Sequence, residues 1–256
     1  TNLASFTDVS AVVTYIDALE SGRYYLYASA NGGTNYSGAT AASPFVVLAA
    51  DNSWKTPVEL NGWTYGDGVT WNAPVPVFSG TVTYSLTGGS LASPITSITS
   101  AALSALSAGS YTLTVRVAEG VSSLDTGDKT ILNYKAMTDV VYFEVSKAAG
   151  GFTTNPSAAG WTYGQSKPTH SSGTPIDASA TVSTGYYKAV YRDNAWVMSD
   201  KLTESELEDG MPKNAGDYFW FVEVGATANY EKNEASVLFS VAKATNGFKG
   251  GTPVLV

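Results

Sequence analysis

The segment Ala215-Gly216-Asp217-Tyr218 begins an apolar run that ends at Val224, and Asn229-Tyr230 and Phe239-Ser240-Val241 follow it. The same series occurs in two earlier places in the chain. The earlier copies are Ala108-Gly109-Ser110-Tyr111 with Asn133-Tyr134 and Phe143-Glu144-Val145, and Ser21-Gly22-Arg23-Tyr24 with Asn35-Tyr36 and Phe45-Val46-Val47. The sequence therefore predicts a tandem array of related modules.

Part of the spacing between the repeated residues is constant, since nine positions separate Tyr36 from Phe45, Tyr134 from Phe143 and Tyr230 from Phe239. The motif Gly-Trp-Thr-Tyr-Gly, at residues 62–66 and 160–164, recurs after 98 residues, and about 100 residues is the length of an immunoglobulin-type sandwich. The spacing predicts the following segments: a partial repeat at 1–50, complete repeats at 51–147 and 148–243, and a linker or first strand of a further repeat at 244–256. Residues 1–50 would then hold only the second half of a repeat. We expect the first half to have been removed or to come from another chain, which would allow self-association through the incomplete module.

Composition favours strands over helices. Thr, Ser, Gly, Ala, Val and Tyr are frequent, and this usage is typical of short strands joined by tight turns. In the stretch 111–117, apolar and polar residues alternate with a period of two, which predicts a half-buried strand. Residues 185–196 are predicted to form a hairpin, and Thr203 with Glu206 predicts one capped helical turn. We therefore expect an all-β fold of tandem immunoglobulin-like β-sandwich modules.

Charge and composition exclude several functional classes. The net charge is −8, so the basic footprint of a nucleic-acid-binding protein is missing and no such partner is predicted. No apolar run approaches the roughly 18 to 20 residues that span a bilayer, so membrane insertion is not predicted either. The chain has no Cys, which rules out disulfides, thiolate catalysis and Cys-ligated metals. The single His170 lies in a polar stretch, where we expect it to be exposed.

The recurring aromatic residues are predicted to be structural. Ala-Gly-x-Tyr at the start of a strand is typical of a tyrosine corner, with its ring in the core and its hydroxyl bonded to nearby backbone. Trp63 and Trp161 occupy a fixed place before a strand, which favours packing over sugar stacking. The predicted core motif is Trp63, Trp161, Tyr24, Tyr111 and Tyr218. Trp71 and Trp196 do not recur and are therefore weak ligand-binding candidates.

Catalytic and metal chemistry have little support in the sequence. Two acidic stretches, 124–128 and 204–209, could offer oxygen ligands to calcium, but neither carries a full loop pattern, and solvated surface is the preferred interpretation. A Lys-to-Asn isopeptide bond is an alternative use of the recurring Lys147, Lys243, Asn133 and Asn229, although solvated lysines explain the pattern more simply. No nucleophile elbow is present. We expect no catalytic residue, no metal and no cofactor.

The order of the motifs resembles that of a known class of modules. Gly-Trp-Thr-Tyr-Gly, residues 80–84, Ala-Gly-x-Tyr, Asn-Tyr and a closing Phe-x-Val-x-Lys-Ala resemble the immunoglobulin-like repeats of large bacterial cell-surface and secreted proteins, found in adhesin-like chains. The closing motif is complete at 143–148 and 239–244, whereas residues 45–49 lack its Lys.

The resemblance implies a non-catalytic, extracellular structural or adhesive protein, which serves as a spacer and as a binding surface for a protein or glycan. Two alternatives stay open. One is a carbohydrate-binding accessory region of a secreted polysaccharide-active enzyme, and the other is a subunit of a self-assembling surface filament.

Overall fold

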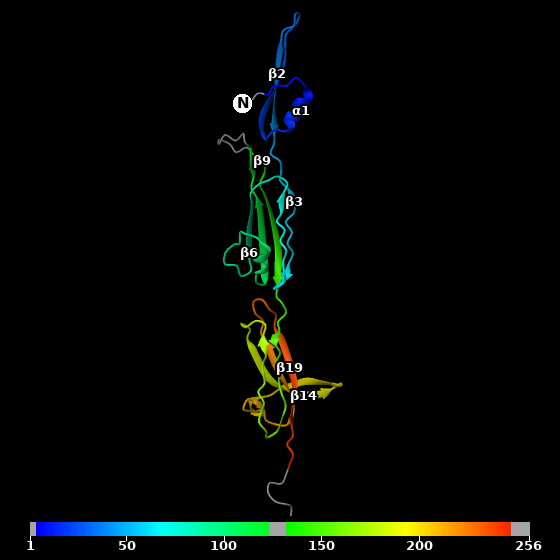
Figure 1. Ribbon diagram of the computed structural model, residues 1–256, viewed down its shortest axis with the longest axis vertical. Coiled ribbons are helices and arrows are strands. Elements are labelled where there is room, and N and C mark those ends of the chain that lie inside the picture. Colours follow the sequence, from blue (N-terminus) through cyan, green and yellow to red (C-terminus); the bar gives the residue numbers. More distant parts are fainter. Residues whose placement is uncertain (1–3, 123–131, 247–256) are drawn as a thin grey trace, which may run out of the picture. The chain divides into compact units, whose positions relative to one another are not determined.

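The computed structural model describes residues 4–122 and 132–246, and most of their regular structure is β-strand (Figure 1). Contacts divide the chain into two compact units. Unit 1 comprises residues 1–62, 68–105 and 109–144, and unit 2 comprises residues 63–67, 106–108 and 145–256. The repeat boundaries read from the spacing stay a prediction. The loop 124–128, proposed above as a calcium candidate, lies outside the described residues.

Unit 1 begins with a helix that follows a capping aspartate. The Asp8 carboxylate accepts a hydrogen bond from the Ser10 N–H at 3.0 Å, which satisfies a free donor of the first turn. The elements of this part of the chain, in order, are α1 (Val9–Asp17), β1 (Gly22–Ala30), β2 (Ala39–Val47), β3 (Trp54–Thr56), β5 (Val75–Pro76), β6 (Val82–Gly88), α2 (Ser100–Ser104), β7 (Gly109–Val117), β8 (Gly120–Val121), β9 (Leu132–Tyr134) and β10 (Met137–Ser146). Strands β1 and β2 form a two-stranded antiparallel sheet.

The second repeat is organised around β7. The sheet order is β4-β10-β7-β6, where β4 (Trp63–Thr64) runs parallel to the end of β10. Alternate residues of β7 are buried, as the period of two predicts: Tyr111, Leu113, Val115 and Val117. Helix α2 follows Thr99, whose hydroxyl accepts from the Ala102 N–H at 3.1 Å, and it carries Leu103, which is fully buried.

Unit 2 is built on a sheet with the order β12-β19-β18-β14-β15. The elements are β11 (Phe152–Thr154), β12 (Trp161–Thr162), β13 (Thr174–Pro175), β14 (Val182–Arg192), β15 (Ala195–Lys201), the 3₁₀ helix η1 (Glu204–Glu206), β16 (Leu207–Glu208), β17 (Met211–Pro212), β18 (Gly216–Val224) and β19 (Asn233–Ala242). The predicted hairpin is confirmed, because β14 and β15 pair on either side of Asp193 and Asn194 (Figure 1). Both of these residues have positive φ, 48° and 64°, which is typical of a type I′ turn.

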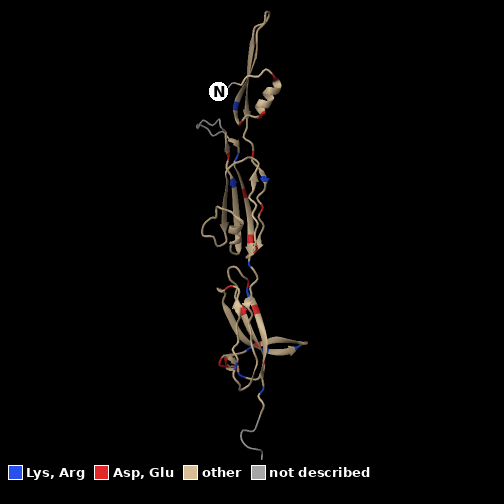
Figure 2. Ribbon diagram, in the orientation of Figure 1, with Lys and Arg blue, Asp and Glu red and all other residues tan. Residues whose placement is uncertain are grey.

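The predicted fold class is confirmed. Strands β19, β18 and β14 lie side by side as the G, F and C strands of an immunoglobulin sandwich do, β15 adds a C′ strand, and β11 pairs with β13 in a separate small sheet. The predicted capped turn is also present, as η1, in which the Thr203 N–H donates to Glu206 Oε2 at 3.0 Å. Within the described residues, Lys and Arg are scattered along both units and gather into no basic stripe (Figure 2).

Candidate functional site

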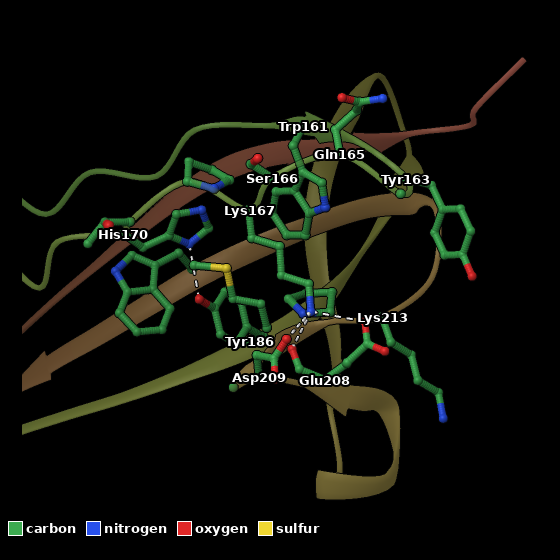
Figure 3. Close-up of a pocket in the computed structure, with 17 residues that line it drawn as sticks. Trp161, Tyr163, Gln165, Ser166, Lys167, His170, Tyr186, Glu208, Asp209 and Lys213 are labelled. Carbon is green, nitrogen blue, oxygen red and sulfur yellow. Dashed lines mark hydrogen bonds and ion pairs between the residues drawn. The ribbon is translucent and has the colours of Figure 1, made fainter.

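The best candidate for a binding site is a cleft of about 850 Å³ in unit 2 (Figure 3). One wall is the loop that follows β12 and runs from Trp161 to His170. The opposite wall is the turn between β16 and β17, and the floor is formed by Tyr186 of β14 and Trp220 of β18. Two loops and one sheet face thus bring together residues that are up to 59 positions apart in the sequence.

The floor of the cleft belongs to an aromatic cluster, which we define as Trp161, His170, Tyr186, Trp220 and Phe239; all of these but Phe239 line the cleft. Neighbouring rings have centroids 4.7 to 6.0 Å apart and are mostly tilted or edge-on, the arrangement that aromatic quadrupoles favour. The cluster continues the apolar core of this sheet, which includes the fully buried Val222. The floor is therefore part of the packed core of this unit.

His170 is the polar centre of this cluster. Its Nε2 lies 3.0 Å from the Ala159 carbonyl oxygen, and its Nδ1 lies 3.1 Å from the Tyr186 hydroxyl. A carbonyl oxygen only accepts, so Nε2 carries the hydrogen, and in the neutral ring Nδ1 accepts from Tyr186. The expectation that His170 is exposed was wrong. The ring is half-buried because it supplies the acceptor that the buried Tyr186 hydroxyl needs.

Burial sets the protonation state of Tyr186. Desolvation raises the pKa of this phenol to about 12, so the group stays a neutral hydrogen-bond donor at ordinary pH. Trp220 is satisfied in a similar way, because its Nε1–H donates to the Ser171 carbonyl at 3.0 Å. The Tyr186 hydroxyl and the Trp220 N–H are thus both hydrogen-bonded within the protein. This arrangement gives no support for acid-base catalysis by these groups.

The rim of the cleft carries an ion cluster around Lys167. Its Nζ donates to the Glu208 carbonyl at 2.6 Å and lies 3.0 Å from Glu208 Oε2 and 3.4 Å from Asp209 Oδ2 (Figure 3). Desolvation lowers the pKa of Lys167, but the hydrogen bonds and charges of the two carboxylates outweigh it and hold this pKa above its ordinary value. Asp209 and Gly210 both have positive φ, so a tight hairpin turn places the carboxylates at the rim.

The cleft is electrically balanced. Two positively charged residues, Lys167 and Lys213, and two negatively charged residues, Glu208 and Asp209, line it. A polar, uncharged ligand that lies against aromatic rings fits this lining better than a strongly charged one does.

The structure places the predicted tryptophans in different surroundings. Trp161 lines the cleft while its ring stacks on Phe239, with centroids 5.7 Å apart, so one residue serves both core and cleft. Trp63 is half-buried in β4, opposite Val145. Trp71 is half-buried and edge-on to Tyr84 at 6.1 Å. Trp196 is 40% exposed on β15, edge-on to Tyr191, and lines no part of the cleft.

The three predicted corner tyrosines stack on the phenylalanine of the closing motif in each repeat. The centroid distances are 5.4 Å for Tyr24 with Phe45, 5.5 Å for Tyr111 with Phe143, and 5.9 Å for Tyr218 with Phe239. The hydroxyl of Tyr24 donates to the Glu20 carbonyl at 2.7 Å, and that of Tyr218 to the Asn214 carbonyl at 3.1 Å. Tyr111 is 2% exposed.

A second recurring arrangement lies where one repeat follows another. In unit 1, Asn133 Oδ1 accepts from the Ser21 N–H at 2.9 Å, and in unit 2, Asn229 Oδ1 accepts from the Ala108 N–H at 2.9 Å. In both places the donor is the residue before the glycine of the Gly-x-Tyr corner. We call this contact the asparagine joint.

The asparagine joint includes the linker between the repeats. Ala50 donates its N–H to the Asn133 carbonyl at 2.9 Å and accepts from the Lys135 N–H at 3.0 Å. Ala148 makes the same two bonds, with the Asn229 carbonyl and the Glu231 N–H, each at 2.9 Å. In unit 2 the Tyr65 ring also lies edge-on to the Tyr230 ring, with centroids 5.6 Å apart.

Sequence reasoning singled out Trp161, His170 and the acidic stretch 204–209, all of which contribute residues to the cleft, but it missed Lys167, Tyr186 and Trp220. The signal was present as a difference between the repeats, because Tyr186 and Trp220 stand where the second repeat has Leu86 and Leu113 in the corresponding strand pair. Among the described residues, no group of three or more His, Asp or Glu side chains could hold a metal ion. No helix in the described part of the chain is long and apolar enough to cross a membrane.

Comparisons with known proteins add two distant structural likenesses. No family model matches the sequence, and no curated protein does. A crystal structure of mouse protocadherin-24 EC1-3 is 12% identical with a TM-score of 0.29, over 87% of this chain and 80% of the other. The immunoglobulin domains 1–5 of sidekick-1 are 14% identical with a TM-score of 0.25, over 88% of this chain and 46% of the other. At these values the functions of those proteins do not transfer to this chain.

Proposed function

We propose that this chain is a non-catalytic, extracellular structural and adhesive segment of a multi-repeat bacterial surface protein, in which the repeats act as spacers and carry binding surfaces. The observation that supports this proposal best is the asparagine joint. A spacer needs consecutive modules that are fixed to one another, and the same joint occurs at both repeat-to-repeat connections that the structure describes.

The joint is suited to this purpose because its hydrogen bonds depend on one side chain. Asn133 and Asn229 each accept one backbone N–H with the side chain, while their own carbonyl oxygens bind the linker. The remaining partners are backbone atoms, so the repeats can vary elsewhere in sequence and keep the joint. This explains why Asn-Tyr recurs although the residues around it change.

An extracellular location is consistent with the composition. The chain has no Cys and few charged residues, so its stability in an oxidising environment does not depend on thiol chemistry. Sheet packing, the stacked Tyr-Phe pairs and the asparagine joint replace disulfides as the elements that hold each repeat and its neighbour.

The proposal is tested by Asn229→Ala. This variant removes the acceptor of the Ala108 N–H, a loss of about 1 kcal/mol for a neutral hydrogen bond, so amide exchange at Ala108 should become roughly fivefold faster. Asn229→Asp keeps an acceptor oxygen and should restore slow exchange. Asn31→Ala, which changes an exposed asparagine outside the joint, is the matched control. Unchanged exchange at Ala108 in Asn229→Ala would remove the support for a fixed spacer.

A second candidate function, glycan binding, is favoured by the cleft. Its aromatic floor, balanced charges and polar rim are what an uncharged saccharide requires, whereas Trp71 and Trp196 do not line it. The chain would then be a carbohydrate-binding accessory region of a secreted polysaccharide-active enzyme.

A glycan array separates the two functions. Binding of neutral oligosaccharides that is reduced at least roughly tenfold by Lys167→Ala, but not by Lys55→Ala on the surface of unit 1, would establish the cleft as the site. Loss in Trp196→Ala instead would place the sugar on the β14-β15 hairpin. If no glycan on the array binds, glycan binding is rejected and the spacer function is the one that stays.

A further inference from the structure

Strand β15 forms one edge of the five-stranded sheet in unit 2, and all of its residues, Ala195–Lys201, are exposed. Among the described residues, β14 is the only segment that hydrogen-bonds to its backbone. The corresponding sheet of the second repeat ends at β6, and that edge is bridged. The Leu86 N–H donates to the Ile95 carbonyl at 2.9 Å, and the Ile95 N–H donates back at 3.0 Å. The third repeat thus has an open strand edge where the second repeat has a covered one.

The register of the β14-β15 hairpin shows which backbone groups of this edge are free. The residues that flank the two-residue turn at 193–194 form a hydrogen-bonded pair. In an antiparallel ladder, such pairs alternate with pairs whose N–H and C=O groups point away from the partner strand. Trp196 and Met198 therefore direct their backbone groups to the open edge, whereas Val197 bonds back to β14.

The centre of this edge carries no device that keeps strands apart. Natural edges are protected by short length, by proline, by charged side chains or by bulges. Residues 195–198 are Ala-Trp-Val-Met, without proline or charge, and the bulge of the hairpin falls after them. Trp196 and Val197 are each 40% exposed, and Met198 is 41% exposed. An apolar edge with free backbone groups is a template for a further strand.

The edge is accessible and lies apart from the contact between consecutive repeats. Strand β14 pairs with β18 only as far as Lys188, so the rest of the hairpin is a two-stranded ribbon that projects from the sheet (Figure 1). The asparagine joint is built from residues that recur, Asn133 and Asn229, whereas β15 has no counterpart in the second repeat. A partner strand for this edge is therefore expected from another molecule.

The edge of β15 is complementary to itself. When two copies lie antiparallel with Val197 opposite Val197, Trp196 of each copy lies opposite Met198 of the other. These are the residues whose N–H and C=O groups are free, so each such pair can exchange two hydrogen bonds. The same register brings Asp193 of one copy towards Lys201 of the other, so opposite charges approach at both ends of the contact.

We propose that β15 is a self-association surface, through which two copies of this chain pair edge to edge. The two sheets then form one continuous sheet across a two-fold axis at Val197. The contact is isologous, so association closes at two copies. This inference goes beyond the proposed spacer function and does not depend on it, because it joins separate chains, whereas the asparagine joint connects repeats of one chain.

Sedimentation equilibrium measures the association. The paired strands are short and the interface is small, so the dimer should be weak, and protein concentrations up to about 1 mM are needed. The weight-average mass should rise with concentration and level off at the mass of two chains.

Amide exchange locates the contact. The N–H groups of Trp196 and Met198 are free in a single chain and bonded in the pair, so their exchange should slow about twofold when half of the chains are paired. The Val197 N–H bonds to β14 in both states, and its exchange should not change.

Charge variants at the two-fold axis test the register. Val197→Lys places two like charges opposite one another and should weaken association about fivefold or more, and Val197→Glu should do the same. In an equal mixture of the two variants, opposite charges face one another, so association should return to within a fewfold of that of the unchanged chain. Val140→Lys, at a residue of β10 that is 41% exposed, is the matched control and should associate as the unchanged chain does.

A monomer at every concentration would overturn the inference. Association that Val197→Lys leaves unchanged, or an equal mixture of the two Val197 variants that stays monomeric, would overturn it as well. Each result is distinct from failure of the spacer function, which is measured by amide exchange at Ala108 in Asn229→Ala.

Discussion

The second and third repeats place different residue pairs at the same point of the same sheet. In the second repeat Leu86 of β6 lies opposite Leu113 of β7, and both are fully buried. In the third repeat Tyr186 of β14 lies opposite Trp220 of β18, and they are 6% and 9% exposed. The aliphatic pair needs no polar partner, whereas the aromatic pair brings a hydroxyl and an indole N–H into the core.

That single difference explains the cleft. The Tyr186 hydroxyl bonds to His170, and the Trp220 N–H donates to the Ser171 carbonyl. These bonds hold the loop after β12 against the aromatic floor, where it forms one wall of the cleft. The second repeat instead has helix α2, whose Leu103 is fully buried. A repeated scaffold can therefore carry a cleft over the sheet in one copy and a closed aliphatic core in the other.

The largest expected effect is on the aliphatic core. Leu113→Ala should lower the free energy of unfolding around β7 by about 3–5 kcal/mol, because a fully buried leucine in a close-packed core leaves a cavity. Hydrogen exchange of the β7 amides measures this loss locally. The control is Leu238→Ala on β19, where the side chain is 40% exposed and the loss should stay near 1 kcal/mol. Equal losses at the two leucines would contradict the assignment of the core.

A smaller effect is expected at the polar centre of the aromatic cluster. His170→Ala removes ring contacts and leaves the Tyr186 hydroxyl without its acceptor, so the free energy of unfolding around β14 and β18 should fall by about 2 kcal/mol. Asn72 is the matched control, because it follows Trp63 by the same nine residues that separate His170 from Trp161. Asn72 is exposed, and Asn72→Ala should change stability by less than about 0.5 kcal/mol. Similar losses in both variants, measured by exchange of amides in the sheet of each repeat, would mean that the histidine is not specific to the cleft.

Much of the fold could be predicted because it depends on local patterns that recur. The period of two in β7, the Asp-Asn turn of the β14-β15 hairpin and the Thr203-Glu206 capping box each act within a few residues. The all-β class follows from many such signals that agree with one another.

The cleft could not be predicted because it depends on contacts across the sheet. Nothing near His170 in the sequence indicates that Tyr186, sixteen residues later, places its hydroxyl beside the ring. The polar residues around it read as a solvated loop, and the residue that draws the loop inward lies on another strand. Aligning the repeats would have shown Leu113 replaced by Trp220, but not which group would satisfy its N–H.

The smallest expected effect is at the 3₁₀ helix η1, which lies between β15 and β16 in the third repeat. Here η1 is tied to β14 by an ion pair, with Glu206 Oε1 2.8 Å from Lys188 Nζ. The hydrogen bond from Lys188, and then those from Thr203, lower the pKa of Glu206 from 4.5 to about 2. A carboxyl whose folded-state pKa is depressed stabilises the fold above its unfolded pKa, and this stabilisation is lost as the pH falls from about 4.5 to about 2.

The melting temperature of the unchanged chain should therefore exceed that of Glu206→Gln at neutral pH, and the two should converge through this window. Screening by solvent keeps the difference small. Glu204→Gln, on an exposed residue of the same turn, should show no such convergence, and a constant difference between Glu206→Gln and the unchanged chain across the window would contradict the role of the ion pair.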